Sequence, residues 1–300
     1  MNSTGFLLDM DGVIYRENHL IPGAAELIRI FQEKSIPFLF LTNNSAPTPE
    51  DLVVKLRHLG IPDLAPRHFY TSAINTADFL SETHPCCTAF VIGEAGLNAA
   101  LQRHKIANDS LKPTYVVVGE GTPNYDRIAK AHELIERGAR LVVTNPDNWC
   151  PVSATATRPG AGALASYLEA STGQRAYYLG KPNPYMFTQA RKRLGSRAQT
   201  VIMVGDTMET DIKGAIESGI QAYLVLTGSS QREDLVNYVY QPTRILESVA
   251  ELVDEFGPDK VFSKSLVAEA HIAQKNGRGN RYRSEDKLRR LHRPRPAMVK

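Results

Sequence analysis

The sequence predicts an α/β fold: a doubly wound parallel sheet that forms a core domain, with a second α/β domain inserted into it as a cap. Apolar runs typical of buried strands alternate with amphipathic helical runs, a pattern that favours parallel strands joined by crossover helices. Polar and charged side chains follow several of these strands directly. Residues 80–178 repeat the alternation without such side chains, which indicates an insertion.

The predicted elements follow this alternation from the N-terminus. A helix over 49–59 is the best marked, because Thr48 suits the N-cap and Pro49 the first helical turn. Strands are predicted over 6–10, 36–41, 88–92, 115–118, 140–144, 176–179, 200–204 and 221–226. The other helices are predicted over 22–33, 72–80, 96–103, 125–136, 162–171, 185–194, 210–218 and 248–256.

These elements divide into three regions. Residues 1–79 and 179–257 are predicted to form the core, and residues 80–178 the cap. Residues 258–300 are predicted to be a disordered basic tail. Of the formal charge of +3, the stretch 275–300 contributes +8, which leaves −5 for residues 1–274. Such a tail could bind nucleic acid or an acidic partner, and a solubilising extension without a partner is the alternative.

The composition is that of an ordinary globular protein, with 42% hydrophobic and 22% charged residues. No apolar run approaches the roughly 18 residues that a membrane span needs, so we expect no membrane partner. The N-terminus lacks the features of a signal peptide. Cys86, Cys87 and Cys150 form no CxxC pair and are expected to be free thiols. On these grounds we expect a cytoplasmic protein.

The most informative segment is Asp9-Met10-Asp11-Gly12, which follows the first predicted strand. Side chains alternate along a strand, so Asp9 and Asp11 are expected to point to the same side. Two carboxylates this close repel one another unless a cation or a shared proton relieves them, which implies a divalent metal. We interpret Asp9 as the nucleophile and Asp11 as the acid/base of a Mg²⁺-dependent phosphoryl-transfer enzyme. A hairpin with Asp11-Gly12 at its turn is the alternative.

Further polar residues follow later strands of the predicted core, namely Thr42, Asn43, Lys181, Asp206 and Asp211. Phosphoryl transfer needs donors and positive charge around the phosphate oxygens, which Thr42, Asn43 and Lys181 can supply. Asp206 can complete an oxygen-ligand set for Mg²⁺, and Asp211 can orient the metal's waters. Because the carboxyl ends of parallel strands meet at one edge of a sheet, we expect these side chains to converge.

Each of these segments also has a simpler interpretation. Thr42-Asn43-Asn44-Ser45 is compatible with a helix cap or an Asx turn, and Asp206 with a helix cap. Gly180-Lys181-Pro182 is compatible with a surface loop, and the spacing of a P-loop is missing around it. The order of the segments, each at a strand end, favours the catalytic interpretation.

The same segments resemble the four motifs of haloacid dehalogenase (HAD) superfamily phosphatases. The aspartate pair, the Ser/Thr loop, the lysine and the acidic loop of that family are matched by residues 9–12, 42–43, 181 and 205–211. Several further runs are similar to the NagD-like subfamily with a C2-type cap, among them Leu41-Thr42-Asn43-Asn44-Ser45, Thr144-Asn145-Pro146-Asp147 and Gly180-Lys181-Pro182-Asn183-Pro184. The resemblance covers residues 5–256.

This resemblance implies a Rossmann-like core with a C2-type α/β cap inserted after the second motif. It implies Mg²⁺ bound by Asp9, the backbone carbonyl of Asp11, and Asp206. The implied activity is hydrolysis of small soluble phosphates through an aspartyl-phosphate. Nucleoside monophosphates such as UMP are the favoured substrates on this basis, before sugar phosphates, phosphoglycolate and aryl phosphates. A homodimer formed through the cap is also expected.

Four cap residues are candidates for contacts with the leaving group: Asn145, Asp147, Trp149 and Arg158. Trp149 is the only tryptophan and could stack on a base, with cap packing or a dimer contact as the alternative. The run Val118-Gly119-Glu120-Gly121 departs from the Val-Gly-Leu-Asp form frequent in the family, although it is similar to the form of the NagD branch itself. Residues 148–159 are this chain's own. Both differences concern the substrate rather than the chemistry.

A different class of function is a binding protein that acts through its basic tail, with a HAD-like core of secondary importance. None of the catalytic residue types is missing from the core, which favours the enzyme.

Overall fold

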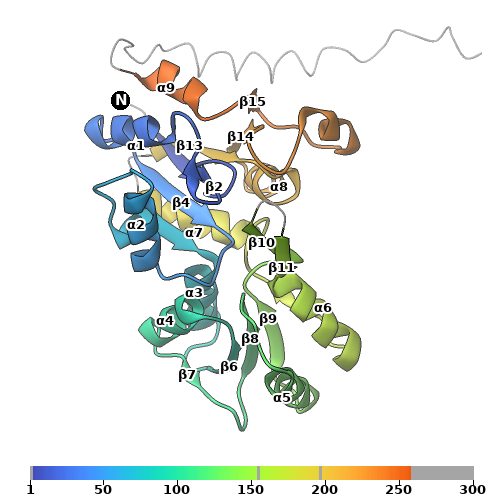
Figure 1. Cartoon of the computed structure of the whole chain (residues 1–300). Coiled ribbons are helices and arrows are strands. Elements are labelled where there is room, and N and C mark those ends of the chain that lie inside the picture. Colours follow the sequence, from blue (N-terminus) through green and yellow to red (C-terminus); the bar gives the residue numbers. More distant parts are fainter. Residues whose placement is uncertain (1–2, 154–155, 196–197, 258–300) are drawn as a thin grey trace, which may run out of the picture. The chain divides into compact units, whose positions relative to one another are not determined.

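The computed structural model describes residues 3–153, 156–195 and 198–257. The predicted tail, residues 258–300, lies outside them. Within the described residues a six-stranded sheet has the order β15-β14-β13-β1-β4-β5, and all of its neighbouring strands are parallel (Figure 1). Its strands are β1 (Ser3–Leu8), β4 (Phe38–Thr42), β5 (Phe69–Thr71), β13 (Ala198–Gly205), β14 (Gln221–Val225) and β15 (Arg244–Leu246).

This order makes the sheet doubly wound. From β1 the chain proceeds to β4 and β5 on one side, and later to β13, β14 and β15 on the other. The point where the direction reverses lies between β1 and β13, and open α/β sheets bind their ligands beside the carboxyl ends of the strands at such a point.

Helices cover both faces of the six-stranded sheet. Helices α1 (Ala24–Glu33), α2 (Pro49–His58) and α9 (Ala250–Phe256) pack on one face. Helices α7 (Pro184–Leu194) and α8 (Lys213–Glu217) pack on the other. Burial on both faces explains why the strands of this sheet are continuous apolar runs.

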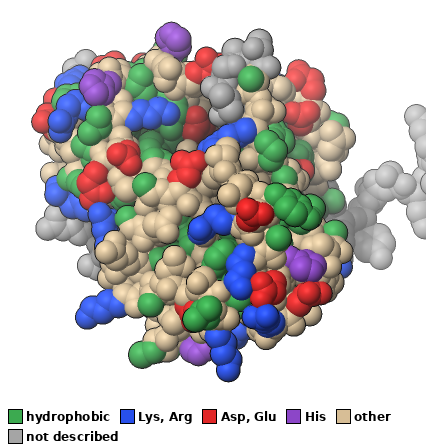
Figure 2. Space-filling view, turned by 60° about the horizontal axis from the view of Figure 1, so that its bottom comes forward, with side chains coloured by type: hydrophobic (Ala, Val, Ile, Leu, Met, Phe, Trp, Pro, Cys, Tyr) green, Lys and Arg blue, Asp and Glu red, His purple; other side chains and the backbone are tan. Residues whose placement is uncertain are grey.

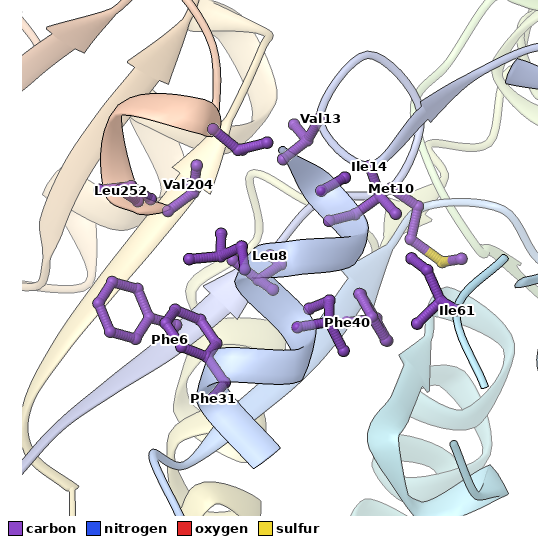
Figure 3. Close-up of a cluster of buried hydrophobic side chains, with 14 of the residues drawn as sticks. Phe6, Leu8, Met10, Val13, Ile14, Phe31, Phe40, Ile61, Val204 and Leu252 are labelled. Carbon is purple, nitrogen blue, oxygen red and sulfur yellow. The ribbon is translucent and has the colours of Figure 1, made fainter. Parts of the chain in front are cut away.

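Strand β1 lies in the middle of this packing (Figure 3). Phe6 and Leu8 face the α1 side, whereas Leu7 faces the α7 side. The Phe6 ring stacks on Phe31 of α1, with ring centroids 4.6 Å apart, and Phe40 and Val204 extend the cluster over the neighbouring strands. The strand that leads to Asp9 is therefore held rigidly on every side.

A second, five-stranded parallel sheet is built entirely from residues inside the stretch predicted to be inserted. Its order is β12-β9-β8-β6-β7, with β6 (Thr88–Ile92), β7 (Ala107–Asn108), β8 (Tyr115–Val118), β9 (Arg140–Val143) and β12 (Tyr177–Tyr178). Helices α3 (Ser72–Thr83) and α4 (Ala95–Arg103) pack on one face, and α5 (Tyr125–Glu136) and α6 (Ala161–Thr172) on the other. The predicted boundary at residue 79 thus falls inside α3.

Most predicted elements agree with the structure within one to three residues, and the strands 88–92 and 115–118 and the helix 125–136 agree residue for residue. Thr48 caps α2 as predicted, and its side chain accepts a hydrogen bond from the Asp51 N–H. The hairpin alternative for Asp11-Gly12 is wrong, because β1 pairs in parallel with β4 and β13.

Other predictions need correction. The helix predicted over 210–218 begins as a π-helical turn, Met208–Ile212, before α8. The short strands β5, β7 and β15 were not predicted. Two antiparallel hairpins were not predicted either, namely β2 (Tyr15–Arg16) with β3 (His19–Leu20) and β10 (Trp149–Ser153) with β11 (Ala156–Pro159).

The surface and the thiols agree with the composition. No helix within the described residues is both long and apolar enough to cross a membrane. Figure 2 shows acidic and basic side chains interspersed on the face that it presents. Cys86, Cys87 and Cys150 are free thiols, as expected.

Candidate active site

Asp9 and Asp206 follow the two adjacent strands at the reversal point of the six-stranded sheet. The Asp9 N–H donates to the Val204 carbonyl of β13 at 2.9 Å, which continues the ladder past the end of β1. Gly12 has φ +76°, a conformation that glycine adopts without strain. A Cβ there would lie 2.7 Å from Asp206 Oδ2, so glycine lets the turn after Asp11 approach Asp206.

Lys181 ties two of the carboxylates together from a buried position. Its Nζ lies 2.7 Å from Asp9 Oδ1 and 2.7 Å from Asp211 Oδ1. Burial alone would lower the pKa of Lys181, but the charges of Asp211 and Asp9 raise it above its usual value, so the ammonium stays protonated. The surface-loop interpretation of Gly180-Lys181-Pro182 is therefore wrong.

Asp206 and Asp211 are also held by the backbone around them. Asp206 Oδ2 accepts a hydrogen bond from the Ser229 N–H at 2.6 Å, and Asp211 Oδ2 accepts one from the Thr207 N–H at 3.1 Å. The carboxylate of Asp206 therefore holds the loop after β14. Burial, and then the nearby charge of Asp9, raise the pKa of Asp206 to about 6.

The three carboxylates form a site with the composition that a hard divalent cation requires. Oxygen atoms of Asp9, Asp206 and Asp211 all lie within 4.8 Å of one another. Among the described residues they pair with the single ammonium of Lys181, so carboxylates outnumber cations in the cluster. Oxygen ligands and surplus negative charge fit Mg²⁺.

Asp11 lies beside this cluster, against Tyr15 of β2. Its Oδ2 accepts a hydrogen bond from the Tyr15 hydroxyl at 3.2 Å, and the Lys55 ammonium lies 3.7 Å from the centre of the Tyr15 ring. Burial raises the pKa of the Asp11 carboxyl, Lys55 opposes that shift, and Asp9 adds to it. A raised pKa suits a group that must donate a proton.

The loop after β4 connects the site to the second sheet. Thr42 Oγ1 accepts from the Asn44 N–H at 3.1 Å, and Asn44 Oδ1 accepts from the Ala46 N–H at 3.0 Å, so this loop does contain an Asx turn. The side-chain amide of Asn43 makes two hydrogen bonds to the backbone of Lys181. Asn43 Oδ1 accepts from the Lys181 N–H at 2.7 Å, and Asn43 Nδ2 donates to the Lys181 carbonyl at 3.1 Å. The Asn43 side chain therefore positions Lys181, and a phosphate contact from it stays a prediction.

Of the four predicted cap residues, two reach this loop directly. Asn145 Nδ2 donates to the Asn43 carbonyl at 2.8 Å, and Asp147 Oδ1 accepts from Asn43 Nδ2 at 3.3 Å. Arg158 lies further along, paired with Glu94 and Glu120. Trp149 is 58% exposed on the β10–β11 hairpin, so it is not a residue of the cap interior.

Two further polar residues at this junction were not predicted. Glu120 is buried after β8 and its N–H donates to Ser45 Oγ at 2.9 Å, and Thr144 Oγ1 donates to the same oxygen at 3.2 Å. The available signal was the position of Glu120 just after a strand, the same signal that identified Asp9 and Asp206.

Comparisons with known proteins agree with this arrangement. The family model described as haloacid dehalogenase-like hydrolase matches residues 6–107, and a HAD-hydrolase-like model matches residues 178–252. Dihydroxyacetone phosphatase of Corynebacterium glutamicum is 38% identical over 83% of this chain and 90% of its own length. The chain belongs to the HAD superfamily.

Within that superfamily it is a NagD-like phosphatase. Ribonucleotide monophosphatase NagD of Escherichia coli is 33% identical over 84% of this chain and 99% of its own length. The crystal structure of a 4-nitrophenylphosphatase from Thermotoga maritima superposes with a TM-score of 0.79 at 33% identity, and covers 85% of this chain and 98% of that one.

Proposed function

We propose that this HAD phosphatase is a Mg²⁺-dependent phosphomonoesterase that works through an aspartyl-phosphate on Asp9. The observation that carries the proposal is the Lys181 ammonium, 2.7 Å from both Asp9 and Asp211, beside Asp206. The ammonium beside Asp9 lies where the charge of a phosphate would have to be neutralised.

The first step forms a covalent intermediate. A carboxylate oxygen of Asp9 attacks phosphorus, the bond from phosphorus to the leaving oxygen breaks, and the Asp11 carboxyl gives its proton to that oxygen. In the second step a water attacks the phosphorus of the aspartyl-phosphate. Asp11, now a carboxylate, takes the proton of that water, and Asp9 is released.

The remaining residues bind and orient. Thr42 and the backbone N–H groups of its loop would hold phosphate oxygens, and Asn43 and Asp211 would position Lys181. Asp9, the backbone carbonyl of Asp11, and Asp206 would hold Mg²⁺. The bound ion would neutralise phosphate charge and orient the phosphate for in-line attack.

The substrate is proposed to be a small phosphate monoester. Relatives named for dihydroxyacetone phosphate, ribonucleotides and nitrophenyl phosphate support this class. Nucleoside monophosphates such as UMP come first, on the resemblance of the chain's motifs to the NagD branch. Sugar phosphates, phosphoglycolate and aryl phosphates follow.

The Asp9→Asn variant tests the mechanism. An amide neither attacks phosphorus nor binds the metal as a carboxylate does, so we expect phosphate release from p-nitrophenyl phosphate to fall at least about 1,000-fold. Asp254→Asn, which alters an exposed carboxylate of α9, is the matched control and should behave like the wild type. Near wild-type turnover by a folded Asp9→Asn protein would refute the mechanism.

A further inference from the structure

The five-stranded sheet has a reversal point of its own. From β6 the chain proceeds to β7 on one side, and then to β8, β9 and β12 on the other. The reversal therefore lies between β6 and β8, where an open α/β sheet binds ligands outside the strand ends. Glu94 is the second residue after β6, and Glu120 is the second residue after β8.

This edge of the second sheet lies against the loop after β4. The Glu120 N–H donates to Ser45 Oγ at 2.9 Å, and the Gly96 N–H donates to the Ala46 carbonyl at 2.8 Å. A Cβ at Gly119 would lie 2.9 Å from Ser45 Oγ, so glycine permits this close approach. The carboxyl ends of both sheets thus meet at the site, one carrying Asp9 and the other Glu120.

The side chain of Asn145 connects the Glu120 carboxylate to the loop after β4, which would hold phosphate. Asn145 Nδ2 is 2.8 Å from the Asn43 carbonyl and 3.5 Å from Glu120 Oε1. On its other side, Glu120 Oε2 lies 3.5 Å from Arg158 Nη2. Both contacts of the carboxylate are longer than an ordinary hydrogen bond, and the Cys150 thiol that also interacts with it is a weak donor.

A buried carboxylate with long contacts can accept further hydrogen bonds. Only 5% of the Glu120 side chain is exposed. A carboxylate offers about four lone-pair sites, more than these contacts use. Hydroxyl groups of a ligand are the donors that such a group binds well.

The charges around Glu120 determine which ligands it would reject. Arg158 Nη1 lies 3.3 Å from Glu94 Oε1, and Arg158 Nη2 lies 3.5 Å from Glu120 Oε2. One guanidinium is therefore paired with two carboxylates. Asp147 adds a further carboxylate close to Glu120. Burial lowers the pKa of Lys55, and the nearby charge of Asp11 opposes that shift. Among the described residues, the guanidinium at this wall of the cap is therefore already shared by two carboxylates, and it leaves little positive charge for a second anion.

We propose that Glu120, held by Arg158, contacts the leaving group of the substrate and selects an uncharged alcohol with several hydroxyl groups over one that carries a carboxylate or a second phosphate. This inference rests on the proposed phosphatase function. Sugars, trioses and nucleosides belong to the favoured class. Glycolate phosphate and bisphosphates fall outside it, because their second anion would face Glu120 and Asp147.

A matched pair of substrates tests this selection. Glycerol 3-phosphate and 3-phosphoglycerate share one carbon skeleton and differ only in a terminal hydroxymethyl or carboxylate group. At pH 8, where the Glu120 carboxyl is ionised, we expect kcat/KM of the wild type to favour glycerol 3-phosphate by about tenfold or more. Fructose 6-phosphate and fructose 1,6-bisphosphate repeat the comparison for a larger leaving group and a second phosphate.

The Glu120→Gln variant removes the charge and keeps the shape. We expect it to reduce the preference for glycerol 3-phosphate at least about fivefold, because the neutral substrate exchanges a charged acceptor for a weaker, uncharged one and the acidic substrate loses a repulsion. Glu133→Gln is the matched control. It removes a cap carboxylate that pairs with Lys130 and Arg137 on the surface of α5, and it should retain the wild-type ratio.

The outcomes separate this inference from the proposed function. If the wild type hydrolyses p-nitrophenyl phosphate but prefers 3-phosphoglycerate, or if folded Glu120→Gln keeps the wild-type ratio, the inference alone is overturned. If the wild type hydrolyses no phosphate ester with Mg²⁺, the proposed function fails and the inference with it. Should Glu120→Gln not fold, Glu120→Asp replaces it: rejection of the acid should persist while kcat/KM for glycerol 3-phosphate falls, and an unchanged value would contradict the inference.

Discussion

At the scale of single residues, the site depends on buried charges that neutralise one another. Lys181 is 2% exposed and pairs with two carboxylates, one of which, Asp211, is completely buried. An ion pair of this kind is costly to break, because removal of one partner leaves an uncompensated buried charge. The sequence indicated the residue types of this cluster, but not that Asn43 brackets Lys181, since that contact joins residues 138 positions apart.

The Lys181→Met variant measures this dependence. We expect the free energy of unfolding at pH 7 in EDTA to fall by about 3–5 kcal/mol, because Asp9 and Asp211 lose their shared cation. Urea denaturation followed by circular dichroism measures the change. Lys130→Met removes a surface partner of Glu133 on α5 and should cost less than about 1 kcal/mol. Equal losses for the two variants would contradict the role assigned to Lys181.

Glu120 makes a separate prediction about pH. Burial, opposed by Arg158, raises the pKa of Glu120 to about 7, so the folded state keeps a proton that the unfolded state has already lost. The stability that Glu120 contributes is therefore fully present below the pKa that this group has in the unfolded state. As the pH rises towards about 7 this contribution is lost, which lowers the free energy of unfolding by up to about 3 kcal/mol. The Glu120→Gln variant lacks this loss. Its melting temperature relative to the wild type should rise between pH 5 and pH 8, and a constant difference would show that Glu120 is not perturbed.

At the scale of elements, the sequence predicted the helices and strands that have a clear apolar pattern of their own. The strands of 88–92 and 115–118 and the helix of 125–136 have strong periodicity, so their bounds agree with the structure. The missed strands, such as those of the β10–β11 hairpin, lack a continuous apolar run, and pairing with a neighbour stabilises them instead. Glu120 was missed as a site residue because its contact with Ser45 spans 75 positions.

The β10–β11 hairpin carries a prediction about specificity. Replacing residues 148–158 with a short Gly/Ser loop removes Arg158 and Trp149, so the ranking of kcat/KM among substrates should change. Turnover of p-nitrophenyl phosphate should fall much less, because Asp9, Asp11, Thr42, Lys181 and Asp206 are untouched. The control replaces residues 109–112, a surface segment that follows β7, with Gly/Ser residues. An unchanged ranking in the hairpin variant would place specificity elsewhere.

At the scale of the whole molecule, two parallel sheets bring their carboxyl ends to one place. The six-stranded sheet supplies Asp9, the proposed nucleophile, and the carboxylates beside it, and the five-stranded sheet supplies Glu120, Asn145 and Asp147. A substrate held between them would be shielded from water on both sides while the phosphate is transferred. Polar strand ends predicted the first half of this arrangement. The second half depends on how the two sheets meet, which spacing along the chain does not encode.

Removal of residues 275–300 tests the alternative function of the basic tail. If catalysis belongs to residues 3–257, Mg²⁺-dependent turnover should survive the truncation within about twofold, since none of the site residues is lost. Oligonucleotide binding, measured by fluorescence anisotropy at two salt concentrations, shows whether the tail also binds nucleic acid. Binding that depends on the tail, in a protein without any turnover, would favour the alternative.

The central claim is that Asp9 becomes phosphorylated during turnover, and mass spectrometry of acid-quenched enzyme tests it most directly. With Mg²⁺ and saturating p-nitrophenyl phosphate, the peptide that contains Asp9 should gain the mass of one phosphoryl group. EDTA should prevent that gain, and Asp9→Asn should abolish it. Steady turnover with no phosphorylated peptide at short quench times, or with the phosphoryl group on another residue, would contradict the account.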